Sequence, residues 1–292
     1  MTADVQILPL RASDGHRWQV LGVQPAQARA ALLWLPALGV AARHYLPLAQ
    51  ALAAGGVASF IHEWRGLGSS SLRAGRRSNW GYRELLEQDL PASARLLRSS
   101  LGDAAPTTTI VGGHSLGGQL ACCHAALAAA GHGGEVYDRL WLVAAGTPHW
   151  RSFAHPQRLL LPAIYAGLRW LSRLTGYLPG RRVGFAGNEA RGLITDWSRV
   201  GQSGRYRAAG LDIDLDAAMA ALQLPVDAVV MARDWMAPAS SLEGLVARMP
   251  STTACGLELD AAELGVAADH FAWMRQPQAV AEALLAGLPK TR

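Results

Sequence analysis

The stretch TTTIVGGHSLGGQLACCHAALAAAG, residues 107–131, decides the fold of this chain. Its start, TTTIV, is apolar and β-branched and predicts a buried strand, whereas the part after Ser115 has the composition and spacing of a helix. Ser115 stands between the two in Gly-His-Ser-Leu-Gly, which matches G-x-S-x-G. In that motif the serine occupies a sharp turn, and the glycines relieve crowding around it. The stretch therefore predicts a nucleophilic serine at the end of a strand.

Short apolar runs alternate with segments of helical spacing over most of the 292 residues. This alternation indicates an α/β fold with a mainly parallel sheet of about eight strands, covered by helices on both faces. The first two runs precede any helix and predict an antiparallel edge of the sheet. The expected strands are residues 5–10, 18–23, 31–36, 57–64, 107–113, 140–146, 226–232 and 252–259.

The alternation breaks once, over residues 147–224, which hold leucine-rich and aromatic helical pieces and ten arginines. Segments of this length between two strands are more often functional than not. We therefore expect a core of residues 1–146 and 225–292 with a helical cap or lid of residues 147–224. Extra packing helices with a solvated arginine face are the alternative interpretation.

A serine nucleophile of this type needs an acid after a later strand and a histidine after the acid. Asp234 directly follows the strand predicted at 226–232, whereas Asp227 would lie at the opposite edge of the sheet. The alternative for Asp234 is an ordinary helix cap. His270 is the one histidine that follows Asp234, and its alternative is a surface histidine. His114 adjoins the serine on a tight turn that points it elsewhere, so we expect it to pack and to form hydrogen bonds.

An oxyanion hole needs two main-chain N–H groups aimed at the developing negative charge. The amide of Leu116, directly after the serine, is the first expected donor. The second should come from the loop after the strand at 31–36, where we expect the amide of Leu38, with Ala37 as the alternative. A plain strand-to-helix turn would carry the same sequence.

Together these residues resemble the α/β-hydrolase superfamily over nearly the whole chain. GHSLGG (113–118) is similar to its nucleophile elbow, and WRGLGSS (64–70) to its R-G-x-G-x-S loop. LPALG (35–39) stands where many members have a His-Gly pair. Pro36-Ala37 in place of that pair keeps the main-chain donors but removes a side chain that usually supports the loop. His62-Glu63 also departs from the usual Asp-Tyr-Arg-Gly pattern.

The closest resemblance is to a bacterial group of predicted α/β hydrolases, and it implies the α/β-hydrolase fold and a serine-hydrolase mechanism without a settled substrate. The pieces that carry it are VAAGTPHWRS (143–152), LTGYLPGRRVGF (174–185) and DHFAWMRQP (269–277).

These features predict hydrolysis of a carboxylic ester with a small or medium, apolar acyl or alcohol group, through a Ser115-His270-Asp234 triad and an acyl-enzyme. A thioesterase, acyltransferase or C–C hydrolase with the same triad is an alternative, as is a non-catalytic binding module. A serine nucleophile argues against haloalkane dehalogenase chemistry, which needs a carboxylate. Trp150, Trp235 and Trp273 are the expected substrate-contacting aromatics, and core filling is their alternative role. The expected partner is a small-molecule ester.

Composition argues against several other classes. The formal charge of +5 comes from scattered arginines, without the basic tracts typical of nucleic-acid binding. Three cysteines without CxxC or metal-ligand spacing predict no metal, no cofactor and a reducing compartment, and we expect the cytoplasm. The best apolar run, residues 159–171, is interrupted by Pro162 and Arg169 and predicts a core or amphipathic helix rather than a membrane span. Contact of the cap arginines with a membrane surface is the weaker interpretation, and a solvated surface the favoured one.

Overall fold

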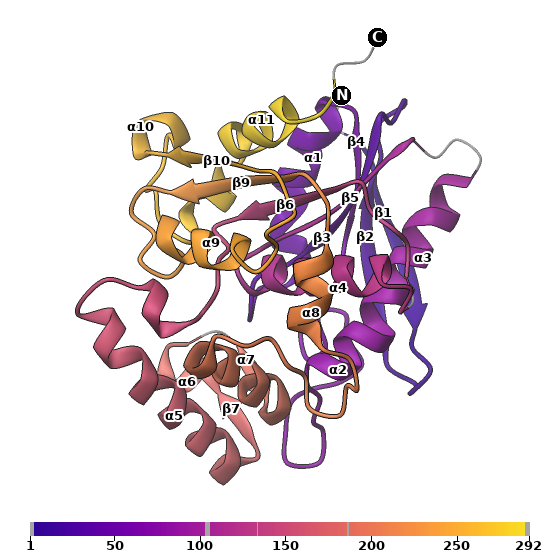
Figure 1. The fold of residues 1–292 in the computed structure, drawn as a ribbon. Helices are drawn as coiled ribbons and strands as arrows, with labels where there is room; N and C mark the ends of the chain where they lie inside the picture. The colour runs from indigo at the N-terminus through magenta and orange to yellow at the C-terminus, as the bar shows by residue number, and fades with distance from the viewer. Residues whose placement is uncertain (1–2, 103–105, 133, 186, 290–292) are drawn as a thin grey trace.

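The computed structural model describes residues 3–102, 106–132, 134–185 and 187–289. Its main sheet has eight strands in the order β1-β2-β4-β3-β5-β6-β9-β10 (Figure 1). Each predicted strand is present, with bounds within three residues of those expected. The strands are β1 (Val5–Arg11), β2 (Arg17–Val23), β3 (Ala30–Leu35), β4 (Val57–Ile61), β5 (Thr108–His114), β6 (Arg139–Val143), β9 (Val226–Met231) and β10 (Ala254–Leu259).

The direction of the strands also matches the prediction. β1 pairs antiparallel with β2, and β2 pairs antiparallel with β4, so the first two strands form the antiparallel edge. From β4 to β10 all neighbours are parallel. The carboxyl ends of β3, β5, β6, β9 and β10 therefore meet at one edge of the sheet, where ligands bind in folds of this kind.

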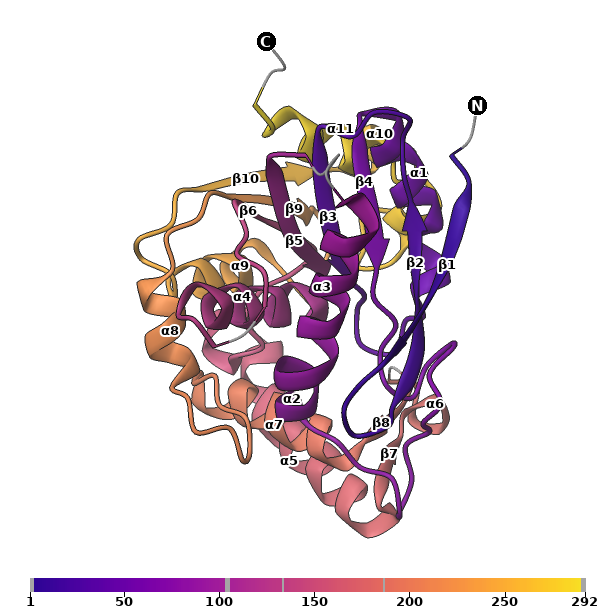
Figure 2. The ribbon, with the colours of Figure 1, turned by 90° about the vertical axis from the view of Figure 1, so that its right-hand side faces the viewer.

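Helices cover both faces of the sheet, as expected (Figure 2). Every residue of β3 is buried: Leu33 and its alternate neighbours belong to the core on one face, and Leu32 and its alternate neighbours to the core on the other. This is why the parallel strands are continuous apolar runs. One face carries α3 (Leu90–Leu101), α4 (Leu116–Ala129), α8 (Leu215–Ala221) and α9 (Ala239–Val246), and the other α1 (Leu46–Ala54), α10 (Ala261–Leu264) and α11 (Gln278–Ala286).

Residues 147–224 stand between β6 and β9 and contain most of the remaining elements. These are η4 (Trp150–Ser152), α5 (Gln157–Thr175), β7 (Tyr177–Pro179), α6 (Gly180–Val183), β8 (Asn188–Ala190) and α7 (Arg191–Ser203), followed by α8. The elements α5 to α7 lie together as a group apart from the sheet, with α5 against α7 (Figure 1), whereas α8 packs on α4. No helix in the described part of the chain is long and apolar enough to cross a membrane.

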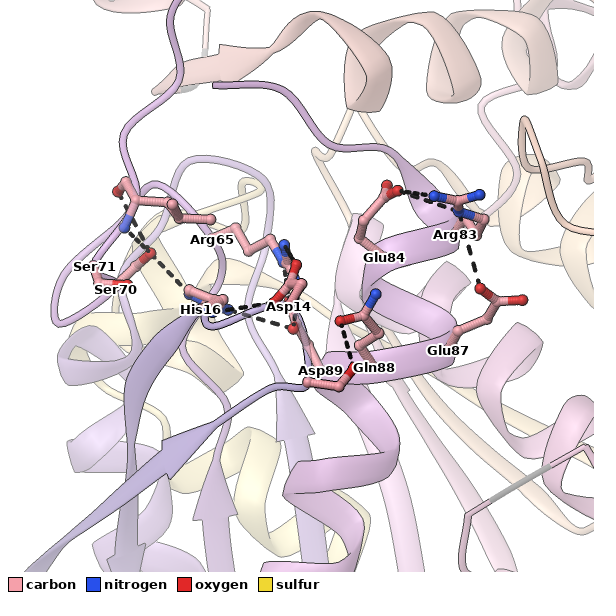
Figure 3. A network of polar contacts seen from close by, with 12 residues as sticks. Asp14, His16, Arg65, Ser70, Ser71, Arg83, Glu84, Glu87, Gln88 and Asp89 are labelled. Carbon is pink, nitrogen blue, oxygen red and sulfur yellow. Dashed lines mark hydrogen bonds and ion pairs between the residues drawn. The ribbon is translucent and has the colours of Figure 1, made fainter. Parts of the chain in front are cut away.

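A buried polar cluster joins the β1–β2 turn to the π-helical turn Leu85–Asp89 (Figure 3). Arg65 donates two hydrogen bonds to the carboxylate of Asp89, at 2.6 and 2.7 Å, and one to Asp14 at 2.6 Å. His16 places Nδ1 3.3 Å from Asp89 and Nε2 3.0 Å from the hydroxyl oxygen of Ser70. These contacts pair the buried charges with one another, and their mutual attraction and hydrogen bonds offset the cost of desolvation.

Candidate active site

Ser115 occupies the strained turn that the sequence predicts, between β5 and α4. Its backbone has φ 55° and ψ −120°, and φ values in this range are rare outside glycine. A Cβ atom on Gly117 would lie 2.0 Å from the carbonyl oxygen of Leu35, and one on Gly113 would lie 2.5 Å from the backbone of Gly117. Glycine at both positions therefore lets the turn pack closely against the end of β3 and present the serine.

Asp234 and His270 form a hydrogen-bonded pair at the ends of neighbouring strands. His270 Nδ1 lies 2.6 Å from Asp234 Oδ2, and both side chains are buried. The other carboxylate oxygen accepts hydrogen bonds from the amides of Met236, at 2.8 Å, and Ala237, at 3.0 Å. Both oxygens of Asp234 are thus engaged, and the carboxylate fixes the ring with Nδ1 as donor. His270 Nε2 then carries the free lone pair.

Ser115 and His270 line one cavity of about 330 Å³, and Leu38 and Leu116 also lie in its wall. The structure therefore brings the predicted nucleophile, base and oxyanion donors to one place. No hydrogen bond joins Ser115 and His270 among the described residues. Hydrogen bonds of this kind are often long in unliganded sites and tighten when substrate binds.

The loop that carries Leu38 is supported by His114 and by Tyr45, whose role the sequence does not reveal. The hydroxyl of Tyr45 accepts a hydrogen bond from the Ala37 amide, at 2.8 Å, and donates one to His114 Nδ1, at 2.9 Å. Burial and the neighbouring His270 lower the pKa of His114 well below its ordinary value, so His114 accepts as a neutral ring. Because the Ala37 amide is engaged, the Leu38 amide is the one left free to meet an oxyanion.

His114 therefore has the packing and hydrogen-bonding role that its place on the turn predicts. Its ring lies 4.8 Å from that of His270 and 5.2 Å from that of Trp273, measured between centroids. Tyr45, on the short helix η1 (Ala42–Tyr45), takes over the support that the missing His-Gly pair usually gives. No local pattern indicates this, because the contact depends on how η1 folds back onto the loop.

Of the three tryptophans expected to contact substrate, the structure places Trp235 in the cavity wall, with 61% of its surface exposed. Trp273 is fully buried and donates to the His270 carbonyl at 3.1 Å, so it supports the base from behind. Trp150 lies in η4 beneath the guanidinium groups of Arg151 and Arg158, outside the set of cavity-lining residues. The other aromatic residues in the wall are Phe153, Tyr165, Phe185, Trp197 and Phe271.

Two polar residues in the wall, Gln119 and Thr147, are not among the predicted site residues. Gln119 follows Ser115 by four positions on α4, so helical periodicity places it on the same face as the nucleophile. That spacing was a usable signal in the sequence. For Thr147, which lies just beyond β6, the sequence holds no comparable signal.

No group of three or more His, Cys, Asp or Glu residues that could hold a metal occurs in the described ranges. The three cysteines are free, with Cys122 and Cys123 buried in α4 and Cys255 exposed in β10. Burial raises the pKa of the Cys122 thiol to about 12, so this group stays a protonated, inert core residue.

The alpha/beta hydrolase family model matches residues 32–283, a range that contains Ser115, Asp234 and His270. The chain therefore belongs to the alpha/beta hydrolase family. No curated protein sequence gives a significant match to it.

Several solved structures share the fold. The structure of DcsB in complex with its substrate analogue is 15% identical, with 97% of each chain covered and a TM-score of 0.64. An epoxide hydrolase from metagenomes of hot environments is 17% identical, with full coverage of both chains and a TM-score of 0.63. The esterase domain of a Rhodothermus marinus protein is 16% identical, with 97% of each chain covered and a TM-score of 0.57.

Proposed function

We propose that this protein is a serine hydrolase that cleaves a carboxylic ester with a small or medium, mainly apolar acyl or alcohol group. One observation carries the proposal: the strained Ser115 lines the same cavity as His270, whose ring is held from behind by the buried Asp234. A nucleophile, a base fixed in the correct tautomer and a third group that orients the base are the parts that acyl transfer requires.

In the proposed reaction, Ser115 Oγ attacks the ester carbonyl carbon while His270 Nε2 takes the hydroxyl proton. The amides of Leu38 and Leu116 stabilise the oxyanion, and Leu116 is suited to this because the first N–H groups of a helix have no acceptor within it. His270 then protonates the leaving alcohol, and an acyl-serine remains. Water, deprotonated by His270, cleaves the acyl-serine and regenerates the hydroxyl.

A serine nucleophile favours carbonyl substrates over epoxides or alkyl halides. Attack of Ser115 on an epoxide carbon would form an ether, which water does not cleave under these conditions, and the enzyme would be trapped. Attack on an ester forms an acyl-serine, which water does cleave. The residue at the elbow therefore supports acyl chemistry for this chain, although an epoxide hydrolase shares its fold.

We propose that residues 147–224 act as the lid of this site. Tyr165, Phe185 and Trp197 from this segment line the cavity together with Ser115. A volume of about 330 Å³ is at the lower end of the range for small-molecule sites, which supports a small or medium substrate. Aromatic walls favour an apolar group next to the scissile bond.

The direct test is labelling with a fluorophosphonate, followed by turnover of p-nitrophenyl esters of increasing acyl length. We expect wild type to be labelled and Ser115→Ala not to be. The matched control is Ser70→Ala. Ser70 is a buried serine that also contacts a histidine, and we expect the Ser70→Ala variant to be labelled like wild type. Absence of labelling in folded wild type would contradict the proposal and favour a non-catalytic binding role.

A further inference from the structure

Gln119 is a polar side chain with an unpartnered amide oxygen in the wall of a cavity that is otherwise mainly apolar. The residue is 5% exposed, and its Oε1 atom is buried without a hydrogen-bond partner among the described residues. It lies in the cavity wall one turn after Ser115 on α4. The side chain therefore lies against the place where the proposed substrate would sit, and its oxygen has no partner in the described protein.

A buried polar group without a hydrogen-bond partner destabilises the fold, and a leucine or methionine would fill the same space without that penalty. A hydrogen-bond partner supplied by a ligand would remove the penalty. Thr147, whose hydroxyl accepts a hydrogen bond from the His149 amide at 3.4 Å, is a second polar side chain that is buried in the same wall. The remaining wall is largely aliphatic and aromatic, so these two residues mark a polar subsite.

We infer that Gln119 is a specificity-determining residue and that the substrate is an ester with a hydroxyl or amide group close to the scissile carbonyl. The inference rests on the proposed ester hydrolysis. Gln119 lies one helical turn after Ser115, about 6 Å along the helix axis, so the recognised group belongs close to the scissile carbonyl. A carboxamide both donates and accepts, so it matches a hydroxyl, which does the same.

The test compares p-nitrophenyl 3-hydroxybutyrate with p-nitrophenyl butyrate on wild type and Gln119→Met. Methionine keeps the length of the side chain and removes its hydrogen bonds. We expect kcat/KM for the hydroxy ester to fall about 10- to 100-fold in the variant. This fall is measured relative to the plain ester, whose kcat/KM reports the general effect of changing a residue of the cavity wall.

A second substrate pair locates the polar group. Butyrate esters of ethylene glycol and of 1-propanol carry the extra hydroxyl on the alcohol side. A loss confined to the glycol ester would assign Gln119 to the alcohol, and a loss confined to the 3-hydroxy acyl ester would assign it to the acyl group. The control is Leu161→Ala, which changes an apolar wall residue and should alter both members of each pair by similar factors.

Binding to Ser115→Ala separates this inference from the proposed function. Methyl 3-hydroxybutyrate should bind Ser115→Ala more tightly than methyl butyrate in ligand-observed NMR, and Ser115→Ala with Gln119→Met should lose that preference. If wild type hydrolyses no ester but the preference is present, ester hydrolysis is wrong and the polar subsite stands. Equal behaviour of hydroxylated and plain esters toward Gln119→Met, in turnover and in binding, would overturn the subsite. Thermal unfolding confirms that each variant is folded.

Discussion

Ser70, His16 and Asp89 lie in contact in one region of the molecule (Figure 3), and Ser115, His270 and Asp234 lie near one another in another region. Measured by distance alone, the first set is the more complete triad, because His16 Nε2 lies 3.0 Å from the Ser70 hydroxyl oxygen. Its surroundings nevertheless differ from those of the second set in the access to the serine and in the partners of the aspartate.

The hydroxyl of Ser70 is buried and accepts hydrogen bonds from the amides of Gly66 and Leu72, at 3.1 Å each. Asp89 is held by the guanidinium of Arg65, which neutralises its charge. Ser115, in contrast, sits at a positive φ and faces a cavity. Access to a cavity, a strained backbone and free main-chain donors therefore single out Ser115, His270 and Asp234 as the candidate site, whereas the three residue types alone do not.

The largest expected effect is the loss of kcat in Asp234→Asn, and the same substitution at Asp89 is the comparison. In Asp234→Asn the side-chain oxygen should accept the hydrogen bonds from the main-chain N–H groups of Met236 and Ala237. The side-chain NH2 group then points toward His270 Nδ1. His270 would then carry its proton on Nε2 and could not accept one from Ser115. We expect kcat to fall about 10⁴-fold while the fold is kept. Ester turnover together with the melting temperature measures both; near-wild-type turnover would exclude Asp234 as the triad acid.

The same exchange at Asp89 should have the opposite result. Asp89→Asn removes the charge that pairs Arg65 and leaves a buried guanidinium with Asp14 as its remaining acid. We expect the free energy of unfolding to fall by about 3–5 kcal/mol, while kcat per folded molecule stays near wild type. Urea unfolding and turnover at low temperature give the two values. A large loss of kcat in the folded variant would mean that the two regions are coupled.

The sequence predicts most of the fold because each strand and helix is a local pattern. The eight strands follow from apolar runs, and Ser115 from a motif whose glycines have a steric reason. Chain order also predicts the pairing of Asp234 with His270, and the structure joins them at 2.6 Å. Asp227, set aside for its position in the strand, pairs instead with Arg139 at 2.8 Å.

Contacts that depend on tertiary packing could not be predicted in the same way. Trp150 and Trp197 both lie in residues 147–224, yet Trp197 lines the cavity and Trp150 stacks with arginines outside it. Helical periodicity shows which face of α7 is apolar but not which partner covers it. The bond from Tyr45 to the Ala37 amide likewise joins a side chain to a main-chain group, and such groups leave no mark on the sequence.

Asp89 and Asp234 each pair with a basic side chain, whereas Glu189 is a buried carboxylate without a salt bridge in the described structure. It accepts one hydrogen bond, from the Gly187 amide at 3.2 Å, and burial raises its pKa to about 7. The folded protein therefore holds this proton more tightly than the unfolded chain does. Stability should fall as pH rises from about 4.5 to about 7 and stay low above that range.

In Glu189→Gln the contribution of this group to the pH dependence should disappear, because the amide keeps the acceptor and has no charge. We expect the variant to be more stable than wild type by about 3 kcal/mol at pH 8, with the difference vanishing near pH 4. Urea unfolding at both pH values provides the measurement. A difference that does not change with pH would show that Glu189 does not titrate in this interval.

The smallest expected effect comes from two tyrosine–histidine pairs that differ in location. Tyr45 bonds His114 at 2.9 Å beside the oxyanion loop, and Tyr137 bonds His124 at 3.0 Å within the core. Tyr45→Phe releases the Ala37 amide, so the Leu38 donor should lose its fixed position and kcat should fall about tenfold with little change in KM. Tyr137→Phe removes a similar hydrogen bond, costs about 1–3 kcal/mol of stability and should leave kcat unchanged. Equal kcat values for the two variants would mean that Tyr45 supports the fold but not the oxyanion loop.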